Sequence, residues 1–273
     1  MGKKIVLITG TSSGIGKQTA IFLSKNNFTV YAASRTPQKL QSVKSDSLIP
    51  IFLDITNFDL VKETINVILK KEQRIDILVN NAGYGLVGTV EDVTEEQMYH
   101  QFDINLFGTL RVCKAVIPTM RVQKSGIIIN ISSFLGKIGL PLLTFYNASK
   151  YAIEGVTDSL RYELKDFNIR VHSIMPGFFN TNFAKDNLMV NQQTFEKNNP
   201  YNHIVSSLAT EILDQINNGN DANEVAKIIL IIIQDKNFKA RVTAGDKAKK
   251  FIPMKKELSD EDFERRVRDY YNL

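Results

Sequence analysis

Strand-like and helix-like stretches alternate along most of this chain, and this alternation constrains the fold more than any other feature. Residues 4–9 form a continuous apolar run, as in strands that are covered on both faces. A helical pattern follows directly, and the two kinds of stretch continue to alternate up to about residue 175. Because parallel strands need long crossovers, which are right-handed, this pattern predicts a parallel sheet with helices on both faces.

The expected strands cover residues 4–9, 29–34, 49–53, 75–80, 126–131, 169–175 and 240–244. The expected helices cover residues 15–25, 57–70, 94–121, 148–167, 223–234 and 259–270, the last capped by Ser259. We therefore predict an α/β fold: one Rossmann-like, doubly wound parallel sheet of about seven strands, with a C-terminal helical extension. In such sheets ligands bind beyond the carboxyl ends of the strands.

Composition is ordinary for a globular protein and excludes few functions, and the length alone allows one large domain or two small ones. The chain has 273 residues, 43% of them hydrophobic, and a net charge of +5. The basic residues are scattered, with the densest cluster near the C-terminus, and they form no stripe with interleaved aromatics. We expect no nucleic-acid partner, because such a stripe is the usual mark of one.

Cysteine, histidine and hydropathy point to a cytoplasmic protein without a metal or a membrane anchor. Cys113 is the only cysteine, so no internal disulfide is expected. The longest aliphatic run, residues 228–233, is far shorter than the roughly 20 residues of a membrane span. The N-terminus lacks a secretory cleavage pattern, and the three histidines show no metal-ligand spacing.

A glycine-rich turn joins the first strand to the first helix. Glycines allow a sharp turn and a close approach by a pyrophosphate, and a helix N-terminus attracts the anion. The alternative is a turn required only for packing, because the spacing G-x-x-x-G-x-G differs from the common dinucleotide fingerprint. The residues of this candidate site are Gly10, Thr11, Ser12, Ser13, Gly14, Ile15 and Gly16.

Ser34 and Arg35 end the second strand, where proteins that bind NAD usually carry an acidic residue. A guanidinium pairs well with a 2′-phosphate. This favours NADP(H) over NAD(H), although Arg35 is alternatively an ordinary surface cation.

The ends of the third and fourth strands carry further candidates. Asp54 and Ile55 follow the third strand, and the Asp54 carboxylate is suited to accept a hydrogen bond from an adenine amino group or simply to cap the chain. Asn81, Ala82 and Gly83 follow the fourth strand. Their small size suits close approach by a cofactor ribose, or merely an ordinary turn.

Tyr146 and Lys150 are four residues apart in a helical stretch, which places both on one face. A nearby ammonium favours the phenolate, so we expect Lys150 to lower the pKa of Tyr146 toward the range of a proton shuttle. Ser133 follows the fifth strand and is suited to hold a substrate oxygen. Alone, the pair fits many surface helices, and Ser133 alternatively just ends a strand.

The conjunction of these motifs closely resembles the short-chain dehydrogenase/reductase family. The matching segments are TGTSSGIG, NNAG, DINLFG, NISS, YNASK and PGFFNT, in the family's order. The resemblance implies a catalytic tetrad of Asn105, Ser133, Tyr146 and Lys150, in which Asn105 interrupts its helix. It also implies cofactor contacts from Pro176, Gly177 and Thr181, and a homodimer or homotetramer. The pattern is most similar to the hydroxysteroid and retinol dehydrogenase branches.

These observations predict an oxidoreductase that moves a hydride between NADP(H) and a carbonyl or alcohol on a small molecule, with Tyr146 as general acid/base. The alternative is a cofactor-binding regulator without turnover. Residues 1–245 are expected to form the catalytic domain, with residues 182–220 as a mobile substrate-covering segment with short helices. Residues 246–273 are expected to extend the same domain as a charged tail.

Overall fold

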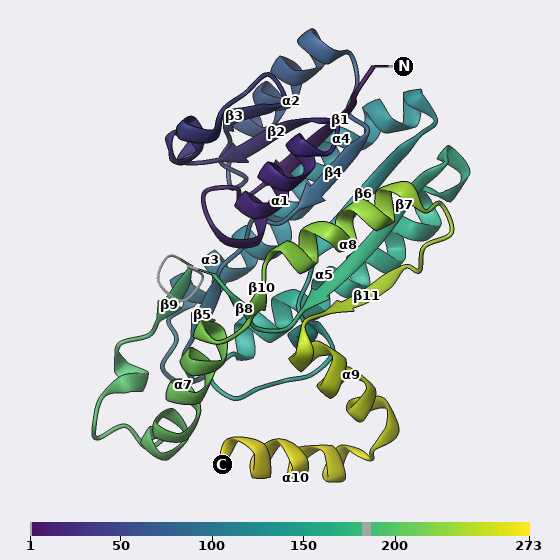
Figure 1. Cartoon of the computed structure of the whole chain (residues 1–273). Helices are drawn as coiled ribbons and strands as arrows, with labels where there is room; N and C mark the ends of the chain where they lie inside the picture. Colours follow the sequence, from purple (N-terminus) through teal and green to yellow (C-terminus); the bar gives the residue numbers. More distant parts are fainter. Residues whose placement is uncertain (1, 182–186) are drawn as a thin grey trace.

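A seven-stranded parallel sheet forms the centre of the computed structural model, which describes residues 2–181 and 187–273 (Figure 1). The strand order is β11-β7-β6-β4-β1-β2-β3, so the order reverses between β1 and β4. The strands are β1 (Lys4–Thr9), β2 (Phe28–Ser34), β3 (Leu48–Phe52), β4 (Ile77–Asn80), β6 (Gly126–Ile131), β7 (Ile169–Pro176) and β11 (Arg241–Ala244). The predicted Rossmann-like fold is confirmed.

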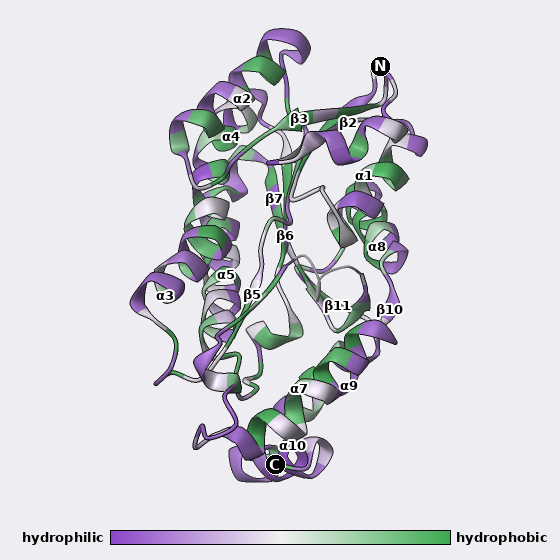
Figure 2. Ribbon diagram, turned by 90° about the vertical axis from the view of Figure 1, so that its left-hand side faces the viewer, coloured by the Kyte–Doolittle hydropathy of each residue, from purple (hydrophilic) through white to green (hydrophobic). Residues whose placement is uncertain are grey.

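Helices cover both faces of this sheet (Figure 2). On one side lie α1 (Gly14–Lys25) and α8 (Asn223–Gln234), and on the other lie α2 (Phe58–Glu72), α4 (Thr109–Gln123) and α5 (Thr144–Glu163). The strands serve both layers because their side chains alternate: Val6 and Ile8 belong to the first apolar cluster, and Ile5 and Leu7 to the second. This two-sided burial explains the unbroken apolar runs in the sequence.

Short helical segments connect the larger elements. A single helix was expected over residues 94–121. The structure has three segments in its place: α3 (Glu95–Phe102), a π-helical turn at Asp103–Gly108, and then α4. The 3-10 turns are Pro37–Val43, Phe134–Gly136, Lys165–Phe167 and Gln193–Phe195. Among the described residues, no helix has both the length and the apolar character that crossing a bilayer requires.

A third apolar cluster lies beyond the carboxyl ends of the strands and is formed by the C-terminal helices. They are α7 (Asn202–Asn217), α9 (Asp246–Glu257) and α10 (Asp260–Tyr271). As predicted, Ser259 caps the last helix, its hydroxyl accepting a hydrogen bond from Asp262 N at 3.1 Å. The expectation of only short helices in residues 182–220 was wrong, because Val205, Leu208, Ile212 and Ile216 bury one face of a 16-residue helix. Residues 182–186 of that segment lie outside the described residues.

Two small strand pairs flank α7: one attaches the segment before α7 to the body of the protein, and the other joins the chain on the two sides of α7. Strand β5 (Gly85–Val87) pairs with β9 (Leu188–Val190), and β8 (Phe179–Asn180) pairs with β10 (Asn220–Asp221). The buried carboxylate of Asp92 reinforces the first pair. It accepts hydrogen bonds from Thr89 Oγ1 at 2.7 Å, Thr194 Oγ1 at 2.9 Å and Asn199 Nδ2 at 2.9 Å. Asp92 thus joins the loop after β5 to residues 194–199, more than a hundred positions along the chain.

Replacing Asp92 with Ala removes the common acceptor of these three donors. We expect the free energy of unfolding in urea to fall by about 1–3 kcal/mol, because buried donors lose their partner. We also expect faster proteolytic cleavage between residues 187 and 200. Glu63→Ala, on the exposed face of α2, is the control and should change stability by less than about 0.5 kcal/mol. Equal losses in the two variants would contradict the anchoring role of Asp92.

Candidate active site

The predicted site residues surround one cavity of about 680 Å³ at the carboxyl ends of the central strands. Eighteen of them line it: Gly10, Ser12, Ser13, Gly14, Ile15, Ser34, Arg35, Asp54, Ile55, Asn81, Ala82, Gly83, Ser133, Tyr146, Lys150, Pro176, Gly177 and Thr181. Three others, Thr11, Gly16 and Asn105, lie behind its wall. The parallel sheet therefore brings together residues that are up to 171 positions apart (Gly10 to Thr181).

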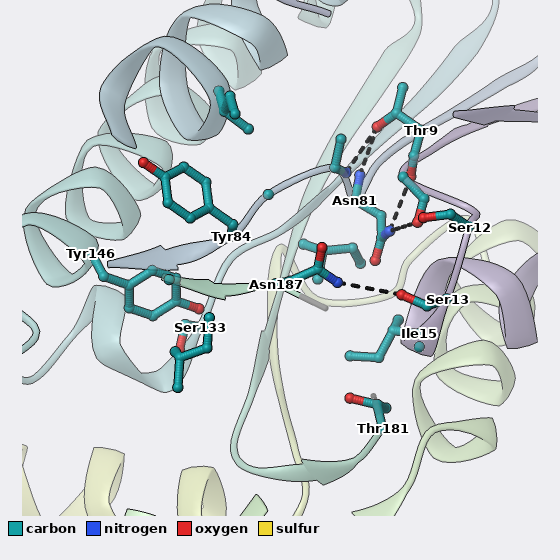
Figure 3. Close-up of a pocket in the computed structure, with 18 of the residues that line it drawn as sticks. Thr9, Ser12, Ser13, Ile15, Asn81, Tyr84, Ser133, Tyr146, Thr181 and Asn187 are labelled. Atoms are coloured by element: carbon teal, nitrogen blue, oxygen red, sulfur yellow. Dashed lines mark hydrogen bonds between the residues drawn. The ribbon is translucent and has the colours of Figure 1, made fainter. Parts of the chain in front are cut away.

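The glycine-rich turn is fixed to the end of β4 by hydrogen bonds (Figure 3). Thr9 Oγ1 accepts from the backbone N–H groups of Asn81 and Ala82, and Asn81 Nδ2 donates to the carbonyls of Thr9 and Gly10, all at 3.0 Å. Gly10 has a φ of +70°, and a methyl group on it would come within 2.6 Å of Ala82 Cα. Only glycine fits both the turn and this close contact.

Thr11 and Gly16 support this turn from behind. Thr11 Oγ1 donates to the carbonyl of Ala33 at 3.1 Å, and Gly16 packs against Asn81. Helix α1 begins at Gly14 in the cavity wall, and the side chain of its N-cap residue, Ser13, makes no capping hydrogen bond. Within residues 2–181 and 187–273 the first N–H groups of this helix lack a capping side chain, and such groups attract an anion in the cavity.

The part of the cavity at the end of β2 carries positive charge. Arg35 and Lys39 line it with exposed side chains, and neither forms an ion pair within residues 2–181 and 187–273. At the end of β2, directly before Arg35, the buried hydroxyl of Ser34 has no hydrogen-bond partner among the described residues. Lys39 was missed in the sequence, where its only signal was its place one turn beyond Arg35.

Asp54 lines the same part of the cavity, but one of its carboxylate oxygens is already engaged. Oδ1 accepts from the backbone N–H and the hydroxyl of Thr56, at 2.9 and 2.7 Å. The capping alternative considered for Asp54 thus describes part of its role, and Oδ2 makes no such contact within the described residues.

Ser133 and Tyr146 lie side by side in the cavity (Figure 3), and Lys150 lines the same cavity. The hydroxyls of Tyr146 and Ser133 share a hydrogen bond, and Lys150 Nζ lies 5.6 Å from the centre of the Tyr146 ring. Lys150 Nζ also donates to the carbonyl of Ile131 at 3.0 Å, and Ser133 Oγ accepts from Leu135 N at 3.1 Å. Helix α5 begins at Thr144, so both residues lie near its start. Tyr146 and Lys150 are four residues apart, which is about one helical turn.

Removal from water dominates the electrostatics of this centre. It raises the pKa of Tyr146 to about 12, opposed by the hydrogen bond with Ser133. It lowers the pKa of Lys150 to about 8, opposed by the charge of Glu154. The expectation that Lys150 lowers the Tyr146 pKa is thus not met in the protein alone, because desolvation of the phenolate outweighs the favourable neighbours.

Asn105 lies in the π-helical turn and is almost fully buried. Its Nδ2 donates to Tyr84 O and Ser149 Oγ, and its Oδ1 accepts from Tyr84 N, all at 3.0 Å. A methyl group on Gly83 would lie 3.0 Å from Asn105 Oδ1 and 3.7 Å from Lys150 Nζ. Asn105 therefore fixes the segment after β4 that passes beside Lys150.

The opposite part of the cavity is apolar and was not located by the sequence motifs. Its walls come from the loop after β6, the start of α5, strand β9 and helix α7. The residues are Leu135, Leu143, Phe178, Leu188, Met189, Ile212 and Ile216, with Tyr84 beside them. The i, i+4 spacing of Ile212 and Ile216 was the one available signal. The described residues contain no cluster of metal-ligating side chains.

A doubly wound parallel sheet whose glycine turn shares a cavity with a Tyr–Lys pair defines a Rossmann-like, dinucleotide-binding class of oxidoreductase. A family model described as short chain dehydrogenase matches residues 4–190. This chain belongs to the short-chain dehydrogenase/reductase family, as its motifs predicted.

Individual relatives cover nearly the whole chain. A 3-ketodihydrosphingosine reductase from Bacteroides thetaiotaomicron is 38% identical over 246 residues, which is 90% of this chain and 89% of that protein. The crystal structure of a short-chain dehydrogenase from Streptomyces avermitilis has a TM-score of 0.84 at 28% identity, covering 100% of this chain and 97% of that one. ElxO with NADP bound has a TM-score of 0.70 at 29% identity, with coverages of 88% and 96%. The hydroxysteroid or retinol branch stays a prediction.

Replacing Asn105 with Ala should leave the N–H group of Tyr84 and the hydroxyl of Ser149 without their Asn105 partner, while the Tyr84 carbonyl keeps the hydrogen bond from Gln101 Nε2 at 2.9 Å. We expect a loss of about 1–3 kcal/mol in the free energy of unfolding, measured in urea, because these groups are buried. Asn218→Ala removes one exposed hydrogen bond, at the end of α7, and should cost less than about 0.5 kcal/mol. A stable Asn105→Ala protein would show that the π-helical turn does not need this side chain.

Proposed function

We propose that the protein is an NADP(H)-dependent reductase that converts a carbonyl group on an apolar small molecule into an alcohol. The observation that carries this proposal is the convergence of Tyr146, Ser133 and Lys150 in the cavity that also contains the glycine turn. NADPH, when bound, supplies the hydride.

Tyr146 and Ser133 act on the substrate oxygen. Their hydroxyls are hydrogen-bonded to each other, so a carbonyl oxygen that enters between them receives two donors as negative charge develops on it. The raised pKa of Tyr146 keeps the phenol protonated at neutral pH, as a proton donor requires. The ammonium of Lys150 then stabilises the phenolate that remains. These properties favour the reductive direction.

The chain's own residues fit a phosphorylated dinucleotide. The N-terminus of α1 suits the pyrophosphate, and Asn81, Ala82 and Gly83 leave room for a ribose. Arg35 and Lys39 lack ion-pair partners among the described residues, and a 2′-phosphate would supply one to both. Pro176, Gly177 and Thr181 line the cavity where the family's nicotinamide contacts are expected. The likeness to NADP-bound ElxO supports the same cofactor.

The apolar half of the cavity sets the substrate class. Among the described residues of this half, from Leu135 to Ile216, no charged side chain is available to pair with a carboxylate or phosphate on the substrate. A ketone carried by an aliphatic chain fits this surface, because burial of apolar area favours binding. The similarity to a 3-ketodihydrosphingosine reductase supports an aliphatic ketone.

The test is NADPH oxidation with a panel of aliphatic ketones, each matched with a keto acid of the same chain length. We expect turnover of the ketones and little turnover of the keto acids. Tyr146→Phe should lower kcat by about 10²–10⁴-fold, because it removes the proton donor. NADPH affinity, measured by fluorescence, should change little.

The same variant separates the enzyme from the alternative of a cofactor-binding regulator. A regulator would bind NADPH, oxidise none of the panel, and retain its biological effect as Tyr146→Phe. Wild-type protein that binds NADPH tightly but reduces no carbonyl compound would therefore count against the reductase.

A second prediction concerns cofactor choice. Arg35→Asp should weaken NADPH binding by roughly tenfold to hundredfold, because a charge-assisted contact is replaced by repulsion, and should leave NADH binding nearly unchanged. Lys39→Ala should act in the same direction but more weakly. Lys44→Ala, an exposed lysine that does not line the cavity, is the control. An unchanged ratio of NADPH to NADH affinity in Arg35→Asp would refute its assignment.

A further inference from the structure

A buried carboxylate lies one helical turn beyond Lys150 on α5. The Glu154 side chain is 3% exposed, and three other elements contact it. Its Oε2 lies 2.6 Å from Arg241 Nε on β11 and 3.4 Å from Lys137 Nζ, which follows the 3-10 turn at Phe134–Gly136. Its Oε1 accepts a hydrogen bond from the Ser173 hydroxyl on β7. None of the sequence motifs includes this cluster.

Glu154 and Lys150 share a tightly packed turn of helix. A methyl group on Gly136 would come within 2.9 Å of the Lys150 carbonyl and 3.2 Å of Glu154 Cγ, so this loop closes over the turn and excludes water from it. Lys150 and Glu154 are both buried. Charges in such surroundings are poorly screened and interact over several ångströms.

The other charged or titratable groups around the pair come from several elements. Tyr146 is on α5 itself, and Tyr84 and His100 line the same cavity. Lys137 and Arg241 contact Glu154, and the other end of the Arg241 guanidinium lies 2.7 Å from the half-exposed carboxylate of Asp158. Among these groups Glu154 is the buried carboxylate; it lies four residues from Lys150 on α5, and its negative charge acts on the Lys150 ammonium.

We propose that Glu154 is a positioning residue that favours the ammonium form of Lys150, and that Arg241 sets how strongly it does so. The guanidinium partly neutralises Glu154. Removing Glu154 takes away the negative charge and leaves Arg241 and Lys137 to repel the ammonium. Removing Arg241 has the opposite effect on Lys150, because the negative charge of Glu154 is then less neutralised and favours the ammonium more strongly. The two substitutions should therefore shift the acid–base behaviour of Lys150 in opposite directions.

The decisive measurement is an NMR titration of protein with ¹³C-labelled lysine side chains. The Lys150 signal is the one that Lys150→Met lacks. We expect Glu154→Gln to lower the pKa of Lys150 by about 0.5–1 unit and Arg241→Met to raise it by a similar amount. The matched control is Asp158→Asn, which removes the exposed carboxylate that contacts the same arginine. The pKa of Lys150 in this control should stay within about 0.2 unit of its wild-type value, because exposed charges are well screened.

This titration does not depend on turnover, so it stands even if the reductase proposal fails. A purely structural cluster would lower the melting temperature in both variants and leave the Lys150 titration unmoved, and that result would overturn the inference. Shifts in the same direction would overturn it too. If Glu154→Gln does not fold, the Arg241→Met and Arg241→Lys variants test the proposal instead. Arg241→Met must raise the pKa of Lys150, and Arg241→Lys must return it to the wild-type value.

The catalytic consequence rests on the proposed function. The alkaline limb of kcat/KM for ketone reduction belongs to the coupled Tyr146–Lys150 pair. It should move to lower pH in Glu154→Gln and to higher pH in Arg241→Met, in parallel with the NMR titration. A limb that stays fixed while the Lys150 titration moves would show that this ammonium does not control the reaction.

Discussion

Burial of the Lys150 ammonium is the interaction on which the rest of the site depends. An unpaired buried charge is costly, and the lowered pKa of Lys150 reflects that cost. Two parts of the fold compensate for it: the carbonyl of Ile131 at the end of β6 accepts a hydrogen bond from the ammonium, and Glu154 one turn along α5 supplies a negative charge. The first comes from the sheet and the second from α5, so the charge is compensated only when these two elements are packed together.

The parallel sheet makes this assembly possible because the carboxyl ends of its central strands meet at one edge. Thr9 and Asn81 are adjacent in space because β1 and β4 are neighbours at the point where the strand order reverses. The same hydrogen bonds hold the glycine turn and the start of the segment beside Lys150. Thr9 and Asn81, which both line the cavity, therefore connect the position of the glycine turn with that of the segment beside Lys150.

Much of this organisation could be predicted from the sequence, since it depends on local patterns. Buried strands are recognisable as apolar runs, and the motifs at their ends identified eighteen of the residues that line the cavity. Helix α9 was missed because its charged face dominates the pattern, and α7 was underestimated because polar residues surround Ile212 and Ile216. The Asp92 anchor includes a partner 107 positions away, and the Glu154 cluster includes one 87 positions away, separations that no local pattern reports. The homo-oligomer and the cytoplasmic location stay predictions.

The two halves of the cavity differ in how they are built, and this difference bears on how function can vary. The cofactor side consists of strand ends and close backbone contacts such as that of Gly10 with Ala82, where a single added methyl group would clash. The apolar side consists of side chains from the loop after β6, the start of α5, β9 and α7; β9 pairs with β5, and α7 packs in the third apolar cluster. Substitutions on α7 and β9 change the shape of this apolar surface at elements that carry none of Tyr146, Ser133 and Lys150. A fold divided in this way keeps one reaction while its substrate changes, which is why the motifs identify the chemistry far better than they identify the molecule on which it acts.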